Sequence, residues 1–436
     1  MIIDWVIDYV SNRKNFPVVL LSPLVYVVGT CAEEIYFGLL KARREGKKLY
    51  ILRPYNVEWL LKYRLTNREL FRIESDYCYS LNGNCWEKLI RFGLTVVYIP
   101  FRVFSLLLRK YSGRSLNESY SFPRIGIMTL WQPKRRMKKF SKQVVHYFDW
   151  TEQLSKYLPV RLGKESFTKA EKIREKIGLG KEDWFVCLHV REAGFRGDFG
   201  RREWRNSSIS NYIPAIKAIT EAGGWVIRMG DNTMTPLPQM DHVIDYPFSQ
   251  FKSDLMDIYL ISECKFYIAS ISGIMDVALL FQKPVLTPNM FSWAFSYPLK
   301  KGDLGIIKHV YSHSQGRFLS IKELFESGWA VQEISGSLGQ DYKMYENSPE
   351  EIKALVCEYL DSLGAEEKKL TTLQENANKE RILNTYRILE EGKAPGTTDD
   401  HINMMEKYRI ASRIESSAGA LGRSFLEENW ERSSKN

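Results

Sequence analysis

The segment that decides the fold runs from residue 183 to residue 231. It begins with DWFVCLHVREAGF at 183–195 and ends with GGWVIRMGD at 223–231. Trp184 to Val190 is a mostly apolar run, bounded by charged residues and too short for a helix, which predicts a buried parallel strand. His189 and Arg191 alternate at the exit of this strand, so their side chains point to the same side. Because open α/β sheets bind ligands beyond the carboxyl ends of their strands, both side chains are expected to face a crevice.

The same pattern of strand and helix continues after this segment. A helix is predicted from Ile209 to Ala222, followed by a Gly223-Gly224 stop and a strand from Trp225 to Met229. Next come a helix over Ser253–Ser262, the strand KFYIAS at 265–270, and the strand KPVLTPN at 283–289. Strands that alternate with helices in this way predict a parallel sheet.

The N-terminal part carries a second unit of this kind. Pro17 to Val28 is an apolar run rich in β-forming residues and predicts a first strand. The helix that follows has Thr30 as a candidate cap, and KLYILRP from Lys48 to Pro54 predicts a second strand. We therefore expect an α/β protein with two Rossmann-like domains facing a cleft. The expected boundaries are residues 1–160 for the N-terminal domain, 161–345 for the C-terminal domain, and 346–436 for a C-terminal helical extension.

Arg191 is the strongest candidate for a binding residue, because an arginine at a strand exit can fork two phosphate oxygens. The loop AGFRGDFGRREWRN at 193–206 adds further basic and amide side chains, among them Arg196, Arg205 and Asn206. Its glycines suggest a loop that closes over a bound diphosphate and excludes water. The alternative is a solvated basic loop, which is what most charge runs are.

Polar or glycine residues also end the neighbouring strands. His189 either orients a phosphate or is a satisfied core residue. Gly230 permits close backbone approach and Asp231 could accept a hydrogen bond from a ribose or a base, although both also suit an ordinary turn. Ser270, Ser272 and Gly273 precede a helix whose first amides could hold a phosphate, or they simply cap it. With Asp276 in that helix, these residues complete the expected substrate site.

The charge balance favours acidic partners. The chain of 436 residues has 62 Lys and Arg against 52 Asp and Glu, a net charge of +10. The segment PKRRMKKFSK at 133–142 carries six basic residues and no acid, and the apolar run 94–108 lies near it in the sequence. Together they predict peripheral contact with anionic lipid. A solvated loop and a core helix are the alternatives.

We expect a cytoplasmic protein, possessing at most peripheral contact with the inner face of the membrane. Asp4 and Asp8 interrupt the first apolar turns and argue against a secretory signal, and Pro100 and Arg102 interrupt the longest apolar run. The six cysteines show no metal-ligand spacing, so reduced thiols and no metal site are expected.

Several motifs of this chain resemble a bacterial family of glycosyltransferases from surface-polysaccharide or glycolipid gene clusters. They are HVR at 189–191, RN at 205–206, SNYIPAI at 210–216, VIRMGD at 226–231, KSDLMDIYL at 252–260, SISG at 270–273 and KPVLTPN at 283–289. The HVR segment is also similar to the HxR motif of fucosyltransferases with the GT-B fold. Glu192 departs from the second basic residue that many fucosyltransferases have after this motif, so the nucleotide stays open.

The resemblance implies a GT-B-like enzyme that inverts configuration and needs no metal or other cofactor. Its donor, a nucleotide-diphosphate sugar, would bind the C-terminal domain, and Arg191 would hold the diphosphate. The acceptor, a glycan or lipid-linked glycan, would bind the N-terminal domain. Such a transfer needs a general base, for which we choose Glu34 over Glu33, although both acids could simply serve the helix dipole.

Two other functions fit the same residues. One is a non-enzymatic basic adaptor on a membrane or RNA surface, although nucleic acid is not the partner we expect. The other is a polysaccharide-modifying transferase of another group, such as pyruvyl, because fold alone does not fix function.

Overall fold

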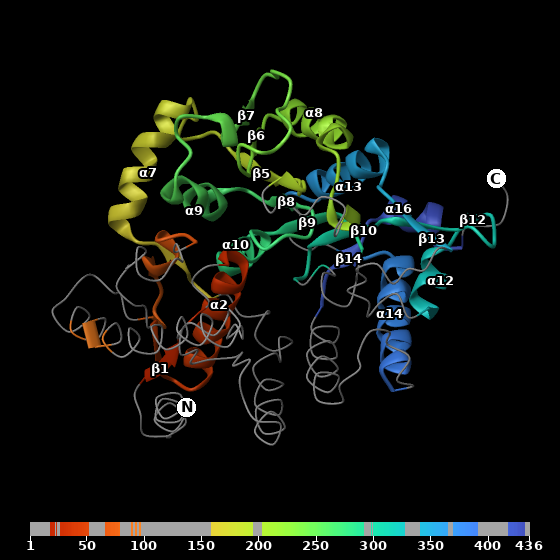
Figure 1. Cartoon of the computed structure of the whole chain (residues 1–436), viewed down its shortest axis with the longest axis horizontal. Coiled ribbons are helices and arrows are strands. Elements are labelled where there is room, and N and C mark those ends of the chain that lie inside the picture. Colours follow the sequence, from red (N-terminus) through yellow and green to blue (C-terminus); the bar gives the residue numbers. More distant parts are fainter. Residues whose placement is uncertain are drawn as a thin grey trace, which may run out of the picture.

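In the computed structural model, the residues described are 18–21, 23, 27–51, 66–78, 89, 92, 93, 96, 158–194, 203–291, 298, 300–327, 341–364, 369–390 and 417–431. They form an α/β fold around a large parallel sheet (Figure 1). Seven strands of the described chain make this sheet, in the order β14-β10-β9-β8-β5-β6-β7. Their bounds are β5 (Phe185–His189), β6 (Trp225–Arg228), β7 (Val243–Asp245), β8 (Tyr267–Ala269), β9 (Val285–Met290), β10 (Leu304–Ile307) and β14 (Ala420–Leu421).

The strand order reverses between β5 and β8. From β5 the chain adds β6 and β7 on one side, and then returns to add β8, β9, β10 and β14 on the other side. All these neighbours pair in parallel. Side chains that follow β5 and β8 therefore lie at the switch point, which is where sheets of this type bind their ligands.

Helices cover both faces of the sheet, and β5 shows why. Phe185 and Cys187 point into the core beneath α7 (Lys164–Ile177), α9 (Asp254–Glu263) and α10 (Met275–Leu280). Val186 and Leu188 point into the opposite core, with η5 (Ile209–Tyr212), α8 (Ile213–Glu221) and α13 (Pro349–Asp361). A strand that is buried on both faces is expected to be apolar, and β5 is apolar up to its last residue, His189.

The N-terminal unit is a parallel strand-helix-strand motif. β1 (Val18–Leu21) pairs with β2 (Lys48–Ile51), and α2 (Val28–Arg44) connects them. Three basic residues occupy the last turn of α2, where the helix dipole favours positive charge. The expected cap was wrong: α2 begins at Val28 with Val27 as its N-cap, so Thr30 lies inside the first turn. Next to this unit, η1 (Glu69–Phe71) precedes β3 (Ile73–Glu74), which pairs with β4 (Arg161–Leu162).

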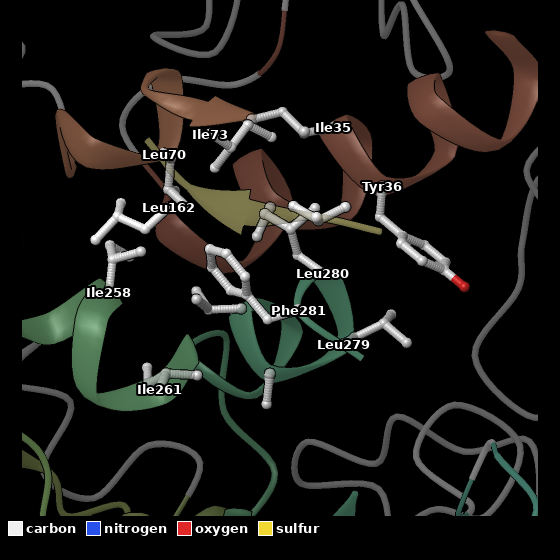
Figure 2. Close-up of a cluster of buried hydrophobic side chains, with 14 of the residues drawn as sticks. Ile35, Tyr36, Leu70, Ile73, Leu162, Ile258, Ile261, Leu279, Leu280 and Phe281 are labelled. Carbon is white, nitrogen blue, oxygen red and sulfur yellow. The ribbon is translucent and has the colours of Figure 1, made fainter. Parts of the chain in front are cut away.

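The N-terminal unit and one face of the large sheet share a hydrophobic core. Figure 2 shows Ile35 of α2 with Ile258 and Ile261 of α9 and with Leu280 of α10 in this cluster. At the start of α2 the backbones touch: a Cβ added to Gly29 would lie 2.2 Å from the carbonyl oxygen of Gly273. The two strand-helix patterns thus form separate parallel sheets joined by α2 and α10, which confirms the α/β class and agrees with the GT-B-like organisation that we expected.

The C-terminal residues are mainly helical, as expected, and they also complete the sheet. α14 (Thr372–Glu390) and α16 (Arg423–Asn429) pack on each other, and between them β14 adds to the edge of the sheet beside β10. A small antiparallel sheet has the order β12-β11-β13, formed by β11 (His309–Ser312), β12 (Arg317–Phe318) and β13 (Tyr342–Tyr345), and α12 (Ile321–Glu326) lies between β12 and β13 in the chain. No helix in the part of the chain that the structure describes is long and apolar enough to cross a membrane.

Candidate functional site

Hydrogen bonds tie the end of β5 to the end of β8. The amide of Ser270 donates to the carbonyl of His189 at 3.0 Å, and the amide of Arg191 donates to the Ser270 hydroxyl at 2.6 Å. The Nδ1 atom of His189 lies 3.1 Å from the Ser272 hydroxyl. The two strand ends at the switch point therefore form one rigid unit, and four of the predicted site residues belong to it.

His189 is buried, and its environment keeps the imidazole neutral. Burial lowers the pKa of His189 to about 4, and the nearby guanidinium of Arg228 acts in the same direction, as does Arg191, while Asp231 opposes them. At neutral pH the ring is therefore an uncharged hydrogen-bonding group. It can orient a ligand, but it does not add positive charge to the site.

Asn206 holds the side chain of Arg191, which is itself buried. The Nη1 atom of Arg191 donates to Oδ1 of Asn206, and the amide of Ser207 donates to the carbonyl of Arg191 at 3.1 Å. Both contacts come from the chain just after η4 (Glu203–Arg205), the end of the basic loop predicted from the sequence. The end of this loop, at Asn206 and Ser207, thus lies against the strand exit.

Arg205 is the second cation of the site. Its Nη2 atom donates to the carbonyl of Ile271 at 3.4 Å, which connects it to the turn after β8. Its guanidinium lies 5.9 Å from the ring centroid of Trp204 and 5.7 Å from that of Phe291. Aromatic rings favour a cation at such distances, so they help to hold Arg205 against the turn after β8.

Arg228 at the end of β6 was not predicted from the sequence. Its side chain is fully buried and forms ion pairs with Glu192 at 3.2 Å and with Asp245 at 3.0 Å. The other oxygen of Glu192 accepts from the amide and hydroxyl of Thr235, both at 2.9 Å. The acidic residue after the HVR motif is thus bound to Arg228 and Thr235. One signal existed: an arginine as the last residue of an apolar strand needs an acidic partner.

Gly230 and Asp231 shape the turn after β6. Gly230 has φ +144°, and an added Cβ would lie 2.2 Å from the sulfur of Met234, so only glycine fits. The Oδ1 atom of Asp231 accepts from the amide of Thr233 at 2.9 Å and also from its hydroxyl. These contacts account for both residues as turn residues, while Asp231 remains close enough to influence His189.

The start of α10 differs from what we expected. The amide of Met275 donates to the carbonyl of Ser272 at 3.1 Å, and that of Asp276 donates to the carbonyl of Gly273 at 3.2 Å. Amides that we expected to be free for a phosphate are therefore used within the turn. Gly273 serves instead as a surface for Gly29 at the start of α2.

Glu34 lies on α2, past the first turn of the helix. It is buried, with 4% of its surface exposed, and it follows Gly29 by five residues along the helix that packs on α10. Arg196 and the basic segment 133–142 lie outside the described residues. In the chain that is described, no group of three or more His, Cys, Asp or Glu side chains is arranged to hold a metal ion.

Comparison with known proteins gives a weak structural likeness and no family assignment. No protein-family model matches the chain, and no curated protein matches it. Among solved structures it is similar to a glycosyl transferase family 9 protein from Veillonella parvula DSM 2008, at 13% sequence identity and a TM-score of 0.36, with 66% of this chain and 84% of that chain covered. At this TM-score the likeness gives no basis for assigning a function.

Proposed function

We propose that the protein is a glycosyltransferase of GT-B-like organisation. It would move a sugar from a nucleoside-diphosphate donor to a glycan or lipid-linked glycan, with inversion of configuration and without a metal ion. The observation that carries the proposal is Arg191, a buried arginine two residues beyond the end of β5, at the switch point of a parallel sheet. That is the position where sheets of this kind bind nucleotides.

The leaving diphosphate gains negative charge as the glycosidic bond to the donor breaks, and a fixed cation stabilises that charge. A guanidinium presents its donors in a planar fork that matches phosphate oxygens. Arg191 supplies this group, and Asn206 fixes its orientation before the ligand arrives. Arg205, held on two aromatic rings, adds a second cation beside the same turn.

The remaining roles follow from position and protonation. Neutral His189, with Ser272 beside it, would donate or accept one hydrogen bond to the donor. Asp231 would contact the ribose or the base. Glu34 remains our candidate for the acceptor's general base, and Glu34→Gln should then lower turnover while nucleoside-diphosphate binding stays intact.

A thermal-shift screen with UDP, GDP, ADP, CDP and dTDP tests the proposal. A ligand at 100 times its dissociation constant stabilises the folded state by about 2.7 kcal/mol, which is a measurable rise in melting temperature. We expect one of these nucleotides to raise it and the corresponding nucleoside, which lacks the diphosphate, to leave it unchanged. If every nucleotide leaves it unchanged, the donor site is refuted and the non-enzymatic adaptor is favoured.

A further inference from the structure

We propose that Lys308 is a positioning residue, which sets the guanidinium of Arg191 through Asn206 and so prepares the site for the donor's diphosphate. The role in diphosphate binding rests on the proposed function, whereas the contact between Lys308 and Asn206 does not.

Lys308 reaches the site from another strand of the sheet. It directly follows β10, and its amide continues the ladder to β9 by donating to the carbonyl of Met290 at 2.7 Å. The side chain is buried, with 3% exposed, and its Nζ atom donates to the backbone carbonyl of Asn206 at 2.7 Å. Since β8 and β9 separate β10 from β5, this contact spans the carboxyl edge of the sheet.

Asn206 connects the two cations. Its backbone oxygen accepts from Lys308, and its side-chain oxygen accepts from Arg191. The next two residues are also bound: the amide of Ser207 donates to Arg191, and the amide of Ser208 donates to Glu346 at 2.9 Å. Segment 206–208 is therefore held from the β10 side by Lys308, from the β13 side by Glu346, and from the β5 side by Arg191.

The burial of Lys308 is costly, which argues that its ammonium has a use. Burial lowers the pKa of Lys308 to about 8, while Glu346 acts in the opposite direction. An apolar side chain of similar size would fill the same space without that desolvation penalty. The ammonium supplies a donor for the Asn206 carbonyl and a further positive charge beside the residue that also binds Arg191, and both serve an anionic ligand.

Hydrogen exchange tests the positioning role without any ligand. Lys308→Met keeps most of the side-chain volume and removes the donor, so the amides of Ser207 and Ser208 should exchange about tenfold faster, the loss of about one charged hydrogen bond. Lys300→Met is the matched control, because Lys300 also donates from Nζ to a backbone carbonyl, that of Lys283, but lies before β10. Unchanged exchange in Lys308→Met, or an equal change in Lys300→Met, overturns the proposal.

The affinity for the nucleoside diphosphate found in the screen tests whether the positioning of Arg191 by Lys308 serves diphosphate binding. We expect Lys308→Met to weaken binding about tenfold, Lys308→Arg to recover part of it, and Lys308→Met to add nothing in an Arg191→Ala background. A full tenfold loss in that background would mean that Lys308 acts independently of Arg191, and it would refute the inference. If the unaltered protein binds none of the nucleotides, the proposed function fails, while the exchange rates still decide whether Lys308 positions Asn206.

Discussion

At the scale of single residues, His189 shows how burial sets the chemistry of the site. In the unfolded chain a histidine takes up a proton near pH 6.5, whereas in the folded protein its pKa is about 4. Between these values the unfolded state binds more protons than the folded state. The folded protein therefore loses stability as the pH falls from about 6.5 to about 4.

This difference predicts a pH-dependent loss of stability that belongs to His189. The free energy of unfolding should fall by about 3 kcal/mol over that range because of this one group. His189→Gln removes the titrating ring and keeps a polar side chain, so its stability should fall less on acidification. Denaturant unfolding of both proteins at several pH values measures this, and parallel curves would show that His189 does not stay neutral.

The residues of the site could be predicted only where sequence neighbours define them. His189 and Arg191 were found because they alternate at the end of a predicted strand, and Asn206 was found because it ends the basic loop that follows. Arg228 and Lys308 were missed because their partners lie far from them in the sequence. Folding brings Glu192 to Arg228, and it brings the backbone of Asn206 to Lys308. The resemblance marked Glu192 only as a departure from a basic residue, whereas in the structure Glu192 forms an ion pair with Arg228.

At the scale of secondary-structure elements, the start of α2 depends on Gly29. An added methyl group there would meet the backbone of Gly273, which side-chain rotation alone does not relieve. We expect Gly29→Ala to lower the free energy of unfolding by about 1–3 kcal/mol, the usual cost of overpacking. Gly93→Ala is the control, because Gly93 is helical and an added Cβ there meets nothing within 4 Å. If denaturant unfolding shows equal stabilities for both variants, α2 does not pack on α10 as described.

Four of the apolar runs predicted their strands well, and β7, β10 and β14 were missed. β5, β6, β8 and β9 lie where they were expected, since each is largely buried and begins with apolar residues, although β5 ends in His189, β6 ends in Arg228 and β9 includes Thr287 and Asn289. β7 and β14 have three and two residues, and their pairing partners rather than their own sequence make them strands. The C-terminal extension was therefore expected to be helical, and its contribution to the sheet was not foreseen.

At the scale of the whole molecule, the basic segment 133–142 predicts attachment to anionic membranes, although it lies outside the described residues. Neutralising Lys134, Arg135, Arg136, Lys138 and Lys139 should release the protein from anionic liposomes and leave nucleotide binding unchanged. Added salt should release it too, because the Debye length at physiological salt is only about 8 Å. Sedimentation with liposomes measures both, and undiminished binding of the neutralised variant would refute this attachment.

The arginines at the switch point also predict that transfer needs no metal ion. With Arg191 and Arg205 beside the expected diphosphate, the charge of the leaving group is balanced by the protein itself. Transfer should therefore proceed at an unchanged rate in EDTA. If EDTA abolished it and magnesium or manganese restored it, the arginine-based account would be wrong.

The most direct test of the central claim is the transfer rate of Arg191→Ala with the donor whose nucleotide binds. Losing one charge-assisted contact of about 1.5–3 kcal/mol should lower the rate at least about tenfold, and Arg191→Lys should recover only part, since an ammonium lacks the fork. Arg317→Ala is the matched control, because Arg317 is an arginine of β12 that pairs with Glu323 outside the site. We predict that the Arg191→Ala variant transfers the sugar slowly and is as well folded as the Arg317→Ala control. Equal turnover in Arg191→Ala and the unaltered protein would contradict the assignment of the donor site.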